Sequence, residues 1–492
     1  MIKYTHDRQK QHYQCRKTER NLPMKKIFAI LIAICMMASM LCVPAFAADE
    51  LPEPAAGVVL RITAIKGDSI ELVGDHTNFK DGWRAAMTLA GDKSEMRSKG
   101  YDRVVVDLYA NWNPSAEDNI EIPEEARVTL NMNGYTINRD LIRFDGVYGG
   151  EAMCICSDAD VIINGGKITG GSSANGAGGI HIKSDARVVL NNVNVVGNHS
   201  EGSNGAGIAV KSGAVLIMNG GSISENAMTE DNYLVYIRYP YGILYACDAT
   251  VTLNNVTIND NRAGTTNGEG MAIYADDSTI TLNNCVVSNN AHDGNGGYAE
   301  SVIGAVDSKL IISNTDFTGN GAVSSKLDVD YSHLFYLENS ELTMEGGKIT
   351  GNKADKLFYF DDSKADLKGV TITDNESVVF DVDNSSAKVT LTECVLGNNS
   401  PVKYDEDIIV DEKGTLVLTD CDLGNTTFKD KNMVTFSDKA VGSIFGEGSL
   451  TTIFVIIALI DSVVSIYMIV LYKKKKAVPA IANNVEETED KE

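Results

Sequence analysis

A repeated eleven-residue pattern constrains this chain more than any other feature. In each copy an apolar strand is broken by Asn or Gly, and a second short apolar piece ends in Asn or a similar turn residue. Eleven copies start 23 to 35 residues apart, and the first is the loosest. They are residues 128–138, 161–171, 188–198, 216–226, 251–261, 280–290, 310–320, 342–352, 365–375, 389–399 and 416–426. Such a period is typical of a solenoid.

The pattern predicts coils of β-strand stacked on one another. Alternating apolar and polar residues indicate strands, and Asn and Gly indicate the turns between them. One unit is too small to bury its own apolar face, but parallel stacking on its neighbours buries it. The chain has 44 Gly and only 9 Pro, which suits a turn-rich β protein. We therefore expect an all-β right-handed parallel β-helix of about eleven coils over residues 128–428.

The pattern also predicts which side chains face inward, namely those at positions one, three, six and eight. Position three is Leu190, Leu253, Leu282, Ile312, Leu367, Leu391 and Leu418, and position eight is Val195, Ile223, Ile258, Val287, Phe317, Ile349, Ile372, Leu396 and Leu423. At position six Cys285, Cys394 and Cys421 alternate with valine, as small buried hydrophobes do. Cys394 and Cys421 fall in consecutive coils, so a disulfide between them is one alternative. Two buried free thiols are the favoured interpretation.

Position eleven is a column of asparagines. Its members are Asn198, Asn226, Asn261, Asn290, Asn320, Asn352, Asn375 and Asn399. A side-chain amide both donates and accepts, so each Asn can bond to the Asn of the next coil. We expect a structural ladder at a turn, with no ligand.

The two ends of the solenoid need covers, because each exposes apolar side chains and unpaired strand edges. Residues 48–127 are predicted as the N-terminal cap region. Within them residues 79–98 place Phe79, Trp83 and Met87 at helical spacing, which predicts a capping helix. Residues 429–449 are predicted as a stalk.

Two apolar segments predict export and anchoring. Residues 24–47 combine Lys25 and Lys26, an apolar stretch and the small-x-small site at 45–47, which is typical of a signal peptide. Residues 1–23 precede Met24 and are interpreted as a mis-assigned extension, added by a start codon chosen too early. Residues 450–472 are long enough to cross a bilayer as one helix, and Lys473 to Lys476 follow directly. The positive-inside rule makes residues 473–492 a cytoplasmic tail and places everything between leader and anchor outside the cell.

The anchor, the basic stop and the short tail resemble the end of a sortase substrate of a Gram-positive bacterium. The LPxTG signal of such proteins is missing, and Gly446-Glu447-Gly448 stands before the anchor instead. We therefore expect anchoring in the membrane rather than covalent attachment to the wall.

The repeats themselves resemble those of polymorphic outer-membrane proteins and of adhesin-like β-helix proteins of gut bacteria. Phe317-Thr318-Gly319-Asn320 has the Phe-x-x-Asn form, and glycine-rich bends precede several copies. The resemblance covers roughly residues 128–428 and implies the pectate-lyase-like parallel β-helix at a cell surface, with a role in attachment. An outer-membrane β-barrel, which such relatives carry at the C-terminus, is replaced here by the helical anchor.

One long unit is rich in tyrosine and is the predicted binding surface. Its tyrosines are Tyr233, Tyr236, Tyr239, Tyr241 and Tyr245. Aromatic rings with polar tips suit glycan or protein recognition. The alternative is a bulged coil whose rings pack on the outer sheet or on each other. A second long unit holds Tyr331, His333, Phe335 and Tyr336.

An enzyme on acidic polysaccharides is the main alternative function. Asn314-Thr315-Asp316, Asp276-Asp277 and Asp361-Asp362 match parts of the polygalacturonase pattern, but its Gly-His-Gly and Arg-Ile-Lys motifs are absent. No catalytic residue is therefore assigned, and a passive structural stalk stays open as a third function.

The net charge and the spacing of possible metal ligands limit the kinds of ligand that this chain can bind. A formal net charge of −24 disfavours nucleic acid. Cys154-x-Cys156 lacks zinc spacing, so no metal site is predicted. We expect no cofactor beyond weak surface calcium at 328–330 or 405–407. The predicted partners are the membrane, through 450–472, and a glycan or protein ligand.

Overall fold

The computed structural model describes residues 51–437, apart from 116–117, 142–149, 174–175, 202–204, 230–241, 264–269, 293–300, 323–331, 383–385, 402–403 and 411–413. The predicted leader at 24–47 and the predicted anchor at 450–472 lie outside these residues. Within the described part of the chain, no helix has the length and apolar character needed to cross a membrane.

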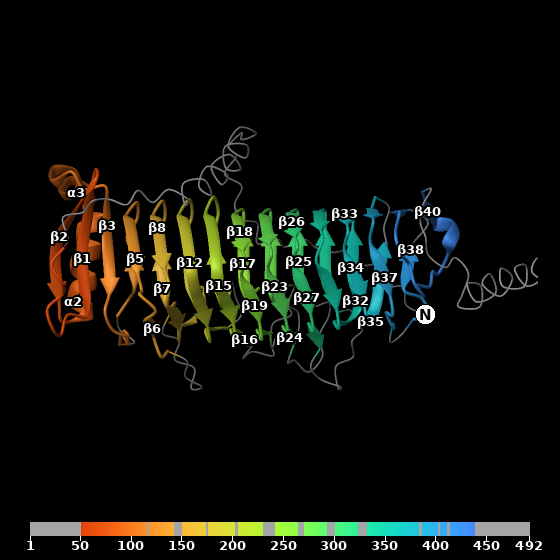
Figure 1. Ribbon diagram of the computed structural model, residues 1–492, viewed down its shortest axis with the longest axis horizontal. Coiled ribbons are helices and arrows are strands. Elements are labelled where there is room, and N and C mark those ends of the chain that lie inside the picture. Colours follow the sequence, from red (N-terminus) through yellow and green to blue (C-terminus); the bar gives the residue numbers. More distant parts are fainter. Residues whose placement is uncertain are drawn as a thin grey trace, which may run out of the picture.

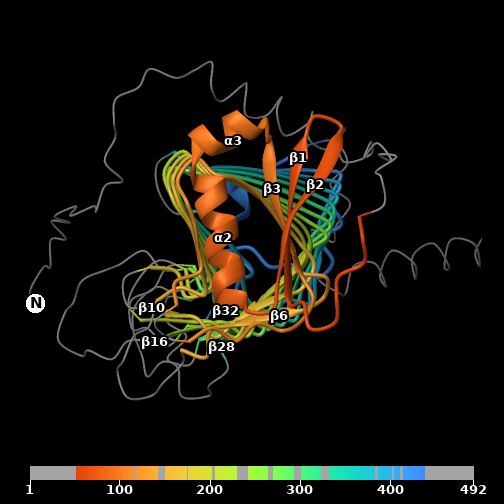
Figure 2. The ribbon, with the colours of Figure 1, turned by 90° about the vertical axis from the view of Figure 1, so that its left-hand side faces the viewer.

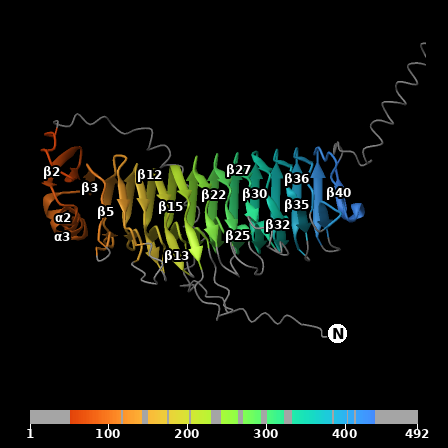
Figure 3. The same cartoon turned by 90° about the horizontal axis from the view of Figure 1, so that it is seen from below.

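The described chain forms one long stack of coils built on two sheets, of 23 and 17 strands, called sheet A and sheet B (Figures 1 and 3). Each coil contributes to both sheets and pairs in parallel with the coils before and after it. For example, β18 (Thr250–Asn254) pairs residue by residue with β22 (Thr279–Asn283). The structure is thus a parallel β-helix, as the repeat predicted.

Sheet A holds two strands from most coils. The first column is β3 (Arg103–Leu108), β5 (Arg127–Asn131), β8 (Asp160–Asn164), β12 (Arg187–Val196), β15 (Val215–Ser224), β18, β22, β26 (Lys309–Ser313), β30 (Glu341–Glu345), β33 (Lys364–Lys368), β36 (Lys388–Thr392), β39 (Thr415–Thr419) and β40 (Val434–Phe436). The second is β6 (Thr136–Asn138), β9 (Lys167–Thr169), the ends of β12 and β15, β19 (Thr257–Asn259), β23 (Val286–Ser288), β27 (Asp316–Thr318), β31 (Lys348–Thr350), β34 (Thr371–Thr373) and β37 (Val395–Gly397).

Sheet B also has two columns. Short strands follow position eleven of the repeat: β10 (Ser172–Ser173), β13 (His199–Glu201), β16 (Ala227–Thr229), β20 (Arg262–Ala263), β24 (Ala291–His292) and β28 (Gly321–Ala322). The other column is β4 (Glu121–Ile122), β7 (Met153–Ile155), β11 (Ile180–Ile182), β14 (Ile208–Val210), β17 (Leu244–Cys247), β21 (Ile273–Asp276), β25 (Ser301–Val306), β29 (His333–Glu338) and β38 (Ile408–Val410). The strands β32 (Lys353–Asp361) and β35 (Glu376–Val382) run through both columns.

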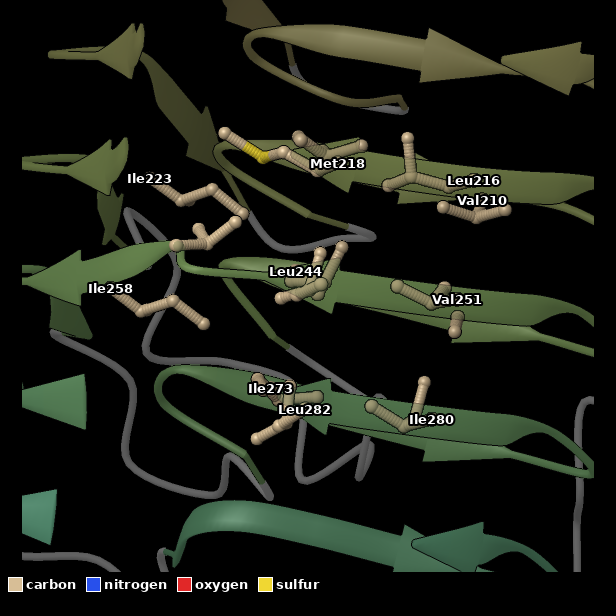
Figure 4. Packing of buried hydrophobic residues seen from close by; sticks show 14 of the residues in the cluster. Val210, Leu216, Met218, Ile223, Leu244, Val251, Ile258, Ile273, Ile280 and Leu282 are labelled. Carbon is tan, nitrogen blue, oxygen red and sulfur yellow. The ribbon is translucent and has the colours of Figure 1, made fainter. Parts of the chain in front are cut away.

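The core lies between the two sheets, and the predicted inward positions are confirmed. Every residue named above for positions three, six and eight is at most 3% exposed. Figure 4 shows how side chains of successive coils line up. Leu216, Val251 and Ile280 form one column of sheet A, and Leu244 and Ile273 of sheet B lie in register in neighbouring coils. One continuous apolar core therefore runs the length of the stack.

The asparagine ladder at position eleven is also confirmed. Each Nδ2 from Asn198 to Asn375 donates to the Oδ1 of the next Asn at 2.8–3.1 Å. The same Nδ2 atoms also donate to a carbonyl of the preceding coil, as Asn290 does to Ile258 at 3.0 Å. The Oδ1 atoms accept in addition from backbone N–H groups. All eight asparagines are buried, so the ladder satisfies polar groups that water cannot reach.

Left-handed backbone at fixed points of the coil explains the Asn, Gly and Asp columns of the repeat. Position five has φ between 45° and 63° in Asn192, Asn255, Asn284, Asn314 and Gly369, among others. Position ten and the corner before each first strand of sheet A behave in the same way, as at Asp260 and Asp277. Gly, Asn and Asp enter this conformation at the least cost.

Two further polar ladders were not predicted. On the outer face of sheet A, Asn131, Asn164, Asn191, Asn219, Asn254 and Asn283 bond in series at 2.7–2.9 Å. At the corner leading into sheet A, the hydroxyls of Ser278, Ser308, Ser340 and Ser363 accept from backbone N–H groups of the preceding coil. Both ladders repeat with the coil and fix its register.

The N-terminal region contains more strand than predicted. The hairpin of β1 (Leu60–Lys66) and β2 (Ser69–His76) joins sheet A because β1 pairs antiparallel with β3. The predicted helix is present as two helices, α2 (Phe79–Gly91) and α3 (Lys93–Lys99), because Asp92 ends the first and caps the second. Figure 2 shows α2 lying across the end of the stack. Trp83 of α2 packs on Trp112, with ring centroids 5.3 Å apart.

At the other end, parallel pairing continues past residue 428. A short 3₁₀ helix, η1 (Lys431–Met433), leads into β40, which pairs in parallel with β39. This strand lies in the residues predicted as a stalk.

Five of the described cysteines are free thiols. Cys285, Cys394 and Cys421 are buried thiols in the core, and Cys154 and Cys156 are free on sheet B. The favoured interpretation of Cys394 and Cys421 as thiols is thus confirmed.

Candidate functional site

The longest connections between strands of the solenoid begin and end at one corner. The segments that vary most in length connect the two columns of sheet B, for example 230–243 between β16 and β17 and 323–332 between β28 and β29. Parallel register stacks the ends of these strands above one another, so the insertions start and finish along a single edge. Figure 2 shows β10, β16 and β28 together at this corner. We call this edge the insertion edge.

Next to the insertion edge, the outer face of sheet B carries a column of tyrosines. Tyr245 of β17 pairs in register with Tyr274 of β21, and their rings stack at 6.0 Å. Tyr336 of β29 and Tyr359 of β32 stack in the same way at 5.4 Å. Tyr245, Tyr274 and Tyr336 are each 5% exposed, although they point away from the core. We call these four residues the tyrosine column.

Gly304 of β25 separates the two halves of the column. It is in register with both Tyr274 and Tyr336. A Cβ at this position would lie 2.9 Å from Cδ2 of Tyr274 and 3.1 Å from Oγ of Ser301. The Tyr274 ring therefore leans over Gly304, which is why a side chain does not fit there.

Lys211 contacts the N-terminal half of the column. Its Nζ lies 4.5 Å from the centre of the Tyr245 ring, a cation–π arrangement. Burial lowers the pKa of Lys211 to about 8. Burial also raises the pKa of the Tyr245 hydroxyl, and nearby Asp276 adds to the effect. The Tyr245 hydroxyl therefore stays protonated at neutral pH.

The C-terminal half of the column packs on charged side chains. Lys356 forms an ion pair with Asp381 and lies 5.2 Å from the centre of the Tyr359 ring. Burial opposes the charge of Lys356, but the Asp381 carboxylate outweighs burial and raises the pKa of the lysine. The ring of His333 lies 5.0 Å from that of Tyr359. A cation, a carboxylate and an imidazole thus meet on one aromatic surface.

His333 is buried as a neutral base. Burial and, to a lesser extent, the charge of Lys356 lower its pKa from 6.5 to about 3. Among the described residues its Nδ1 has no hydrogen-bond partner, and neither has Oγ of Ser301, its register neighbour on β25.

The buried imidazole predicts a loss of stability in mild acid. Between pH 6.5 and about 3 the unfolded chain binds a proton on His333 that the folded chain does not. The free energy of unfolding should therefore fall as the pH drops through this window, by up to about 1.4 kcal/mol per unit for this group. Urea unfolding at pH 7, 6, 5 and 4 measures this slope.

His333→Phe supplies the comparison, because the aspartates titrate equally in both proteins. The pH slope of this variant should be shallower than that of the parent. Parallel curves for the two proteins would contradict the assignment of the slope to His333.

Of the five tyrosines predicted to form a binding surface, only Tyr245 lies within the described residues. Tyr233, Tyr236, Tyr239 and Tyr241 lie outside the described residues, so their role stays a prediction. Tyr245 packs on Tyr274 and on the outer sheet, which is the alternative that the sequence left open. In the second long unit, Phe335 faces the core and is fully buried, whereas His333 and Tyr336 face outward.

The carboxylates that resembled polygalacturonase residues have structural roles. Asp277 and Asp362 occupy left-handed corners of the coil. Thr315 is fully buried, and its Oγ1 accepts from the N–H of Cys285 at 3.2 Å. Asp316 accepts from the N–H of Lys348 at 3.0 Å.

Metal ligands do not gather in the part of the chain that the structure describes. No group of three or more His, Cys, Asp and Glu side chains there is arranged to hold a metal ion. Of the two predicted calcium loops, 328–330 lies outside the described residues. In the other, Asp407 is buried and accepts from the N–H and the hydroxyl of Thr427 at 2.7 and 2.8 Å.

Sequence reasoning missed Tyr274, Tyr359, Lys356 and Asp381. A signal for the tyrosines was present, because each precedes the Asp/Asn-Ser corner of its coil by a similar offset, as in residues 273–278 and 358–363. Aligning the units on this corner rather than on the apolar frame would have found the column.

Comparison with known proteins gives one match. Residues 241–432 match a family model described as the right handed beta helix region. A search of curated proteins gave no match, and a search of solved structures gave none. The matched segment covers the coils from β17 to η1, whose strands pair in parallel throughout. The chain is therefore a parallel β-helix repeat protein, and residues 241–432 are similar to β-helices of the right-handed type.

Proposed function

We propose that this protein is a membrane-anchored surface protein of a Gram-positive bacterium that projects its β-helix to bind a glycan or a protein. The observation that carries the proposal is the insertion edge. Solenoids keep their stacking faces regular and place insertions on the face that binds. Here the coil-to-coil variation falls at one edge of sheet B, beside the tyrosine column.

The regular stack supports a role as a rigid support for that edge. Three ladders of Asn and Ser side chains join successive coils. Thirteen strands stack in the first column of sheet A, and at about 4.8 Å between neighbours they give a rod of about 60 Å. In this proposal the leader at 24–47 exports the chain, the helix at 450–472 holds it in the membrane, and the N-terminal end points outward.

In the same proposal α2 caps the N-terminal end. Trp83, Ala86, Met87 and Ala90 form its buried face. Phe79 stacks on Trp112 at 5.4 Å, which fixes the start of the helix against the first coil. A helix in this place covers apolar side chains that the first coil would otherwise expose.

Ligand binding should depend on the tyrosines of the long insertion. Changing Tyr233, Tyr236, Tyr239 and Tyr241 together to Ser is expected to weaken binding at least tenfold, since aromatic anchors commonly carry 1–3 kcal/mol or more each. The measurement is a glycan array on the purified full-length chain, with and without calcium, followed by titration of the glycans that bind.

Tyr404→Ser is the matched control, because Tyr404 is 39% exposed and lies in another part of the chain. It should bind as the parent does. Equal binding by the fourfold variant would remove the insertion from the proposed site. If no glycan binds, the proposed ligand is a protein. That form of the proposal is tested by measuring the attachment of cells that express the chain.

A cell-bound polysaccharide lyase or hydrolase is the second candidate. One observation favours it, namely the meeting of Lys356, Asp381 and His333 on the Tyr359 ring. Proton transfer by such groups could break a glycosidic bond. Reducing-end and unsaturated-product assays on acidic polysaccharides separate the two functions, because a binder releases no product.

A further inference from the structure

A second cluster of reactive side chains lies on the outer face of sheet B, near the N-terminal end. Cys154 of β7 is in register with Glu121 of β4 on one side and with His181 of β11 on the other. Cys156 follows two residues later and is 8% exposed, whereas Cys154 is more accessible. Both thiols are free.

Lys183 and Glu121 join the two thiols. The Nζ of Lys183 donates to Sγ of Cys156 at 3.7 Å and also hydrogen-bonds Cys154. The thiol of Cys156 donates to Oε1 of Glu121 at 2.9 Å. One ammonium group thus faces both sulfurs, and a carboxylate accepts a hydrogen bond from the thiol of Cys156. The sequence had offered no histidine near this pair, but coil stacking brings His181 beside Cys154.

The backbone allows the two sulfurs to bond to each other. Residues two apart on a strand point to the same face, and their Cα atoms are about 6.6 Å apart. Disulfides span Cα separations up to about 6.8 Å. Cys156 follows the last residue of β7, and the chain turns at Asp158, where φ is 57°. The pair therefore lies at the end of a strand, where a small adjustment brings the sulfurs together.

We propose that Cys154 and Cys156 form a dithiol site that exchanges with external disulfides and is converted to an intramolecular disulfide. The thiolate of Cys154, having lost its proton to water, attacks an external disulfide RSSR and releases one RS⁻. Cys156 then loses its proton to water as well, and its thiolate attacks the Cys154 sulfur of the mixed disulfide and releases the second RS⁻. Both leaving thiolates take up a proton, so two protein thiols are oxidised and RSSR is reduced to two RSH. This inference stands apart from the proposed binding function.

The two cysteines have different surroundings and therefore different roles in the exchange reaction. The more accessible Cys154 meets the external disulfide first. Burial raises the pKa of the Cys154 thiol, while Lys183 acts in the opposite direction. Burial and the bond to Glu121 raise the pKa of Cys156 to about 12, so this thiol reacts second. Oxidation should therefore be faster at pH 9 than at pH 7.

The test uses the purified full-length chain, folded and fully reduced, with oxidised glutathione as the external disulfide. Free thiols are blocked at intervals with one alkylating reagent, the protein is then reduced and labelled with a second, and the peptides are analysed by mass spectrometry. Cys154 and Cys156 are expected to lose reactivity together, with the loss of two hydrogens. Cys285, Cys394 and Cys421 lie in the core and serve as internal references.

Variants separate the two steps of the exchange. Cys156→Ser should trap glutathione on Cys154, because the second thiol is missing. Cys394→Val is the control and should leave the Cys154–Cys156 disulfide unaffected, because Cys and Val both occur at position six. Lys183→Met should slow oxidation about tenfold, the effect of one pKa unit on the thiolate population, and Lys183→Arg should restore the rate. Two thiols that stay free in the folded chain, or that each take up glutathione without pairing, would overturn the proposal.

Discussion

Replacing Asn290 by alanine is expected to lower the free energy of unfolding by about 2–4 kcal/mol, since buried polar groups left without a partner cost about 1–3 kcal/mol each. Asn290 stands in the middle of the buried ladder. Its Nδ2 donates to Ile258 and Asn320, and its Oδ1 accepts from Nδ2 and the backbone N–H of Asn261. Alanine removes all four bonds and leaves the Asn261 N–H without its acceptor. Urea unfolding followed by circular dichroism measures the loss.

Asn283→Ala is the matched control, because it is the same substitution in the same coil. Asn283 ends the ladder on the outer face of sheet A, where its Nδ2 donates to Asn254 at 2.8 Å. The group is only partly buried, so water replaces the lost bond, and the expected cost is below about 1 kcal/mol. Equal losses in the two variants would show that burial does not set the strength of the ladders.

The core and the buried ladder could be predicted because they repeat with the coil. An apolar residue at position three or eight always meets its equivalent in the next coil, so periodicity alone assigns Leu253 and Ile258 to the interior. Asn290 was predicted for the same reason, since a buried turn that recurs needs the same amide each time.

The outer face of sheet B could not be predicted in this way. Its side chains follow insertions of unequal length, so Tyr274 and Tyr359 are out of phase with the apolar frame that defines the units. Lys356 and Asp381 meet because β32 and β35 run straight through the corner that carries insertions in earlier coils. Their pairing depends on the lengths of whole coils, and the positions that repeat within each eleven-residue unit do not reveal those lengths.

Phe335 shows why the local amino-acid composition is a poor guide to which side chains of sheet B face outward. It lies among Tyr and His residues in a long unit, which favoured a recognition surface. In the structure, the alternation along β29 is broken, because the neighbours Leu334 and Phe335 both join the core. His333 and Tyr336 lie outside the core, with their rings 5.7 Å apart. Phe335 stacks on Phe358 at 4.8 Å, and Phe358 stacks on Phe380 at 5.0 Å.

This aromatic stack occupies a column that is aliphatic in earlier coils. Leu244, Ile273 and Ile303 precede Phe335, and Ile408 follows Phe380. The three phenylalanine rings are fully buried and fill the C-terminal half of the core.

Phe358→Ala is therefore expected to lower the free energy of unfolding by about 3–5 kcal/mol, the usual cost of truncating a buried aromatic ring. The ring contacts a stacked neighbour on both sides, so its removal leaves a cavity that neither Phe335 nor Phe380 can fill without leaving its own coil. Phe358→Leu keeps most of the volume and should lose less than half as much. Thermal and urea unfolding of the three proteins gives the comparison.

Tyr359→Phe is the control on the opposite face of the same strand. It keeps the ring that stacks on Tyr336 and removes only the hydroxyl, so its stability should stay within about 1 kcal/mol of the parent. Because each coil contacts only its neighbours, the Phe358→Ala cavity should loosen the coils around β32 before those around β12. Hydrogen exchange resolved by peptide measures this difference. A uniform rise in exchange along the whole stack would show instead that the solenoid unfolds as one cooperative unit, and that the stack of phenylalanines sets the stability of every coil.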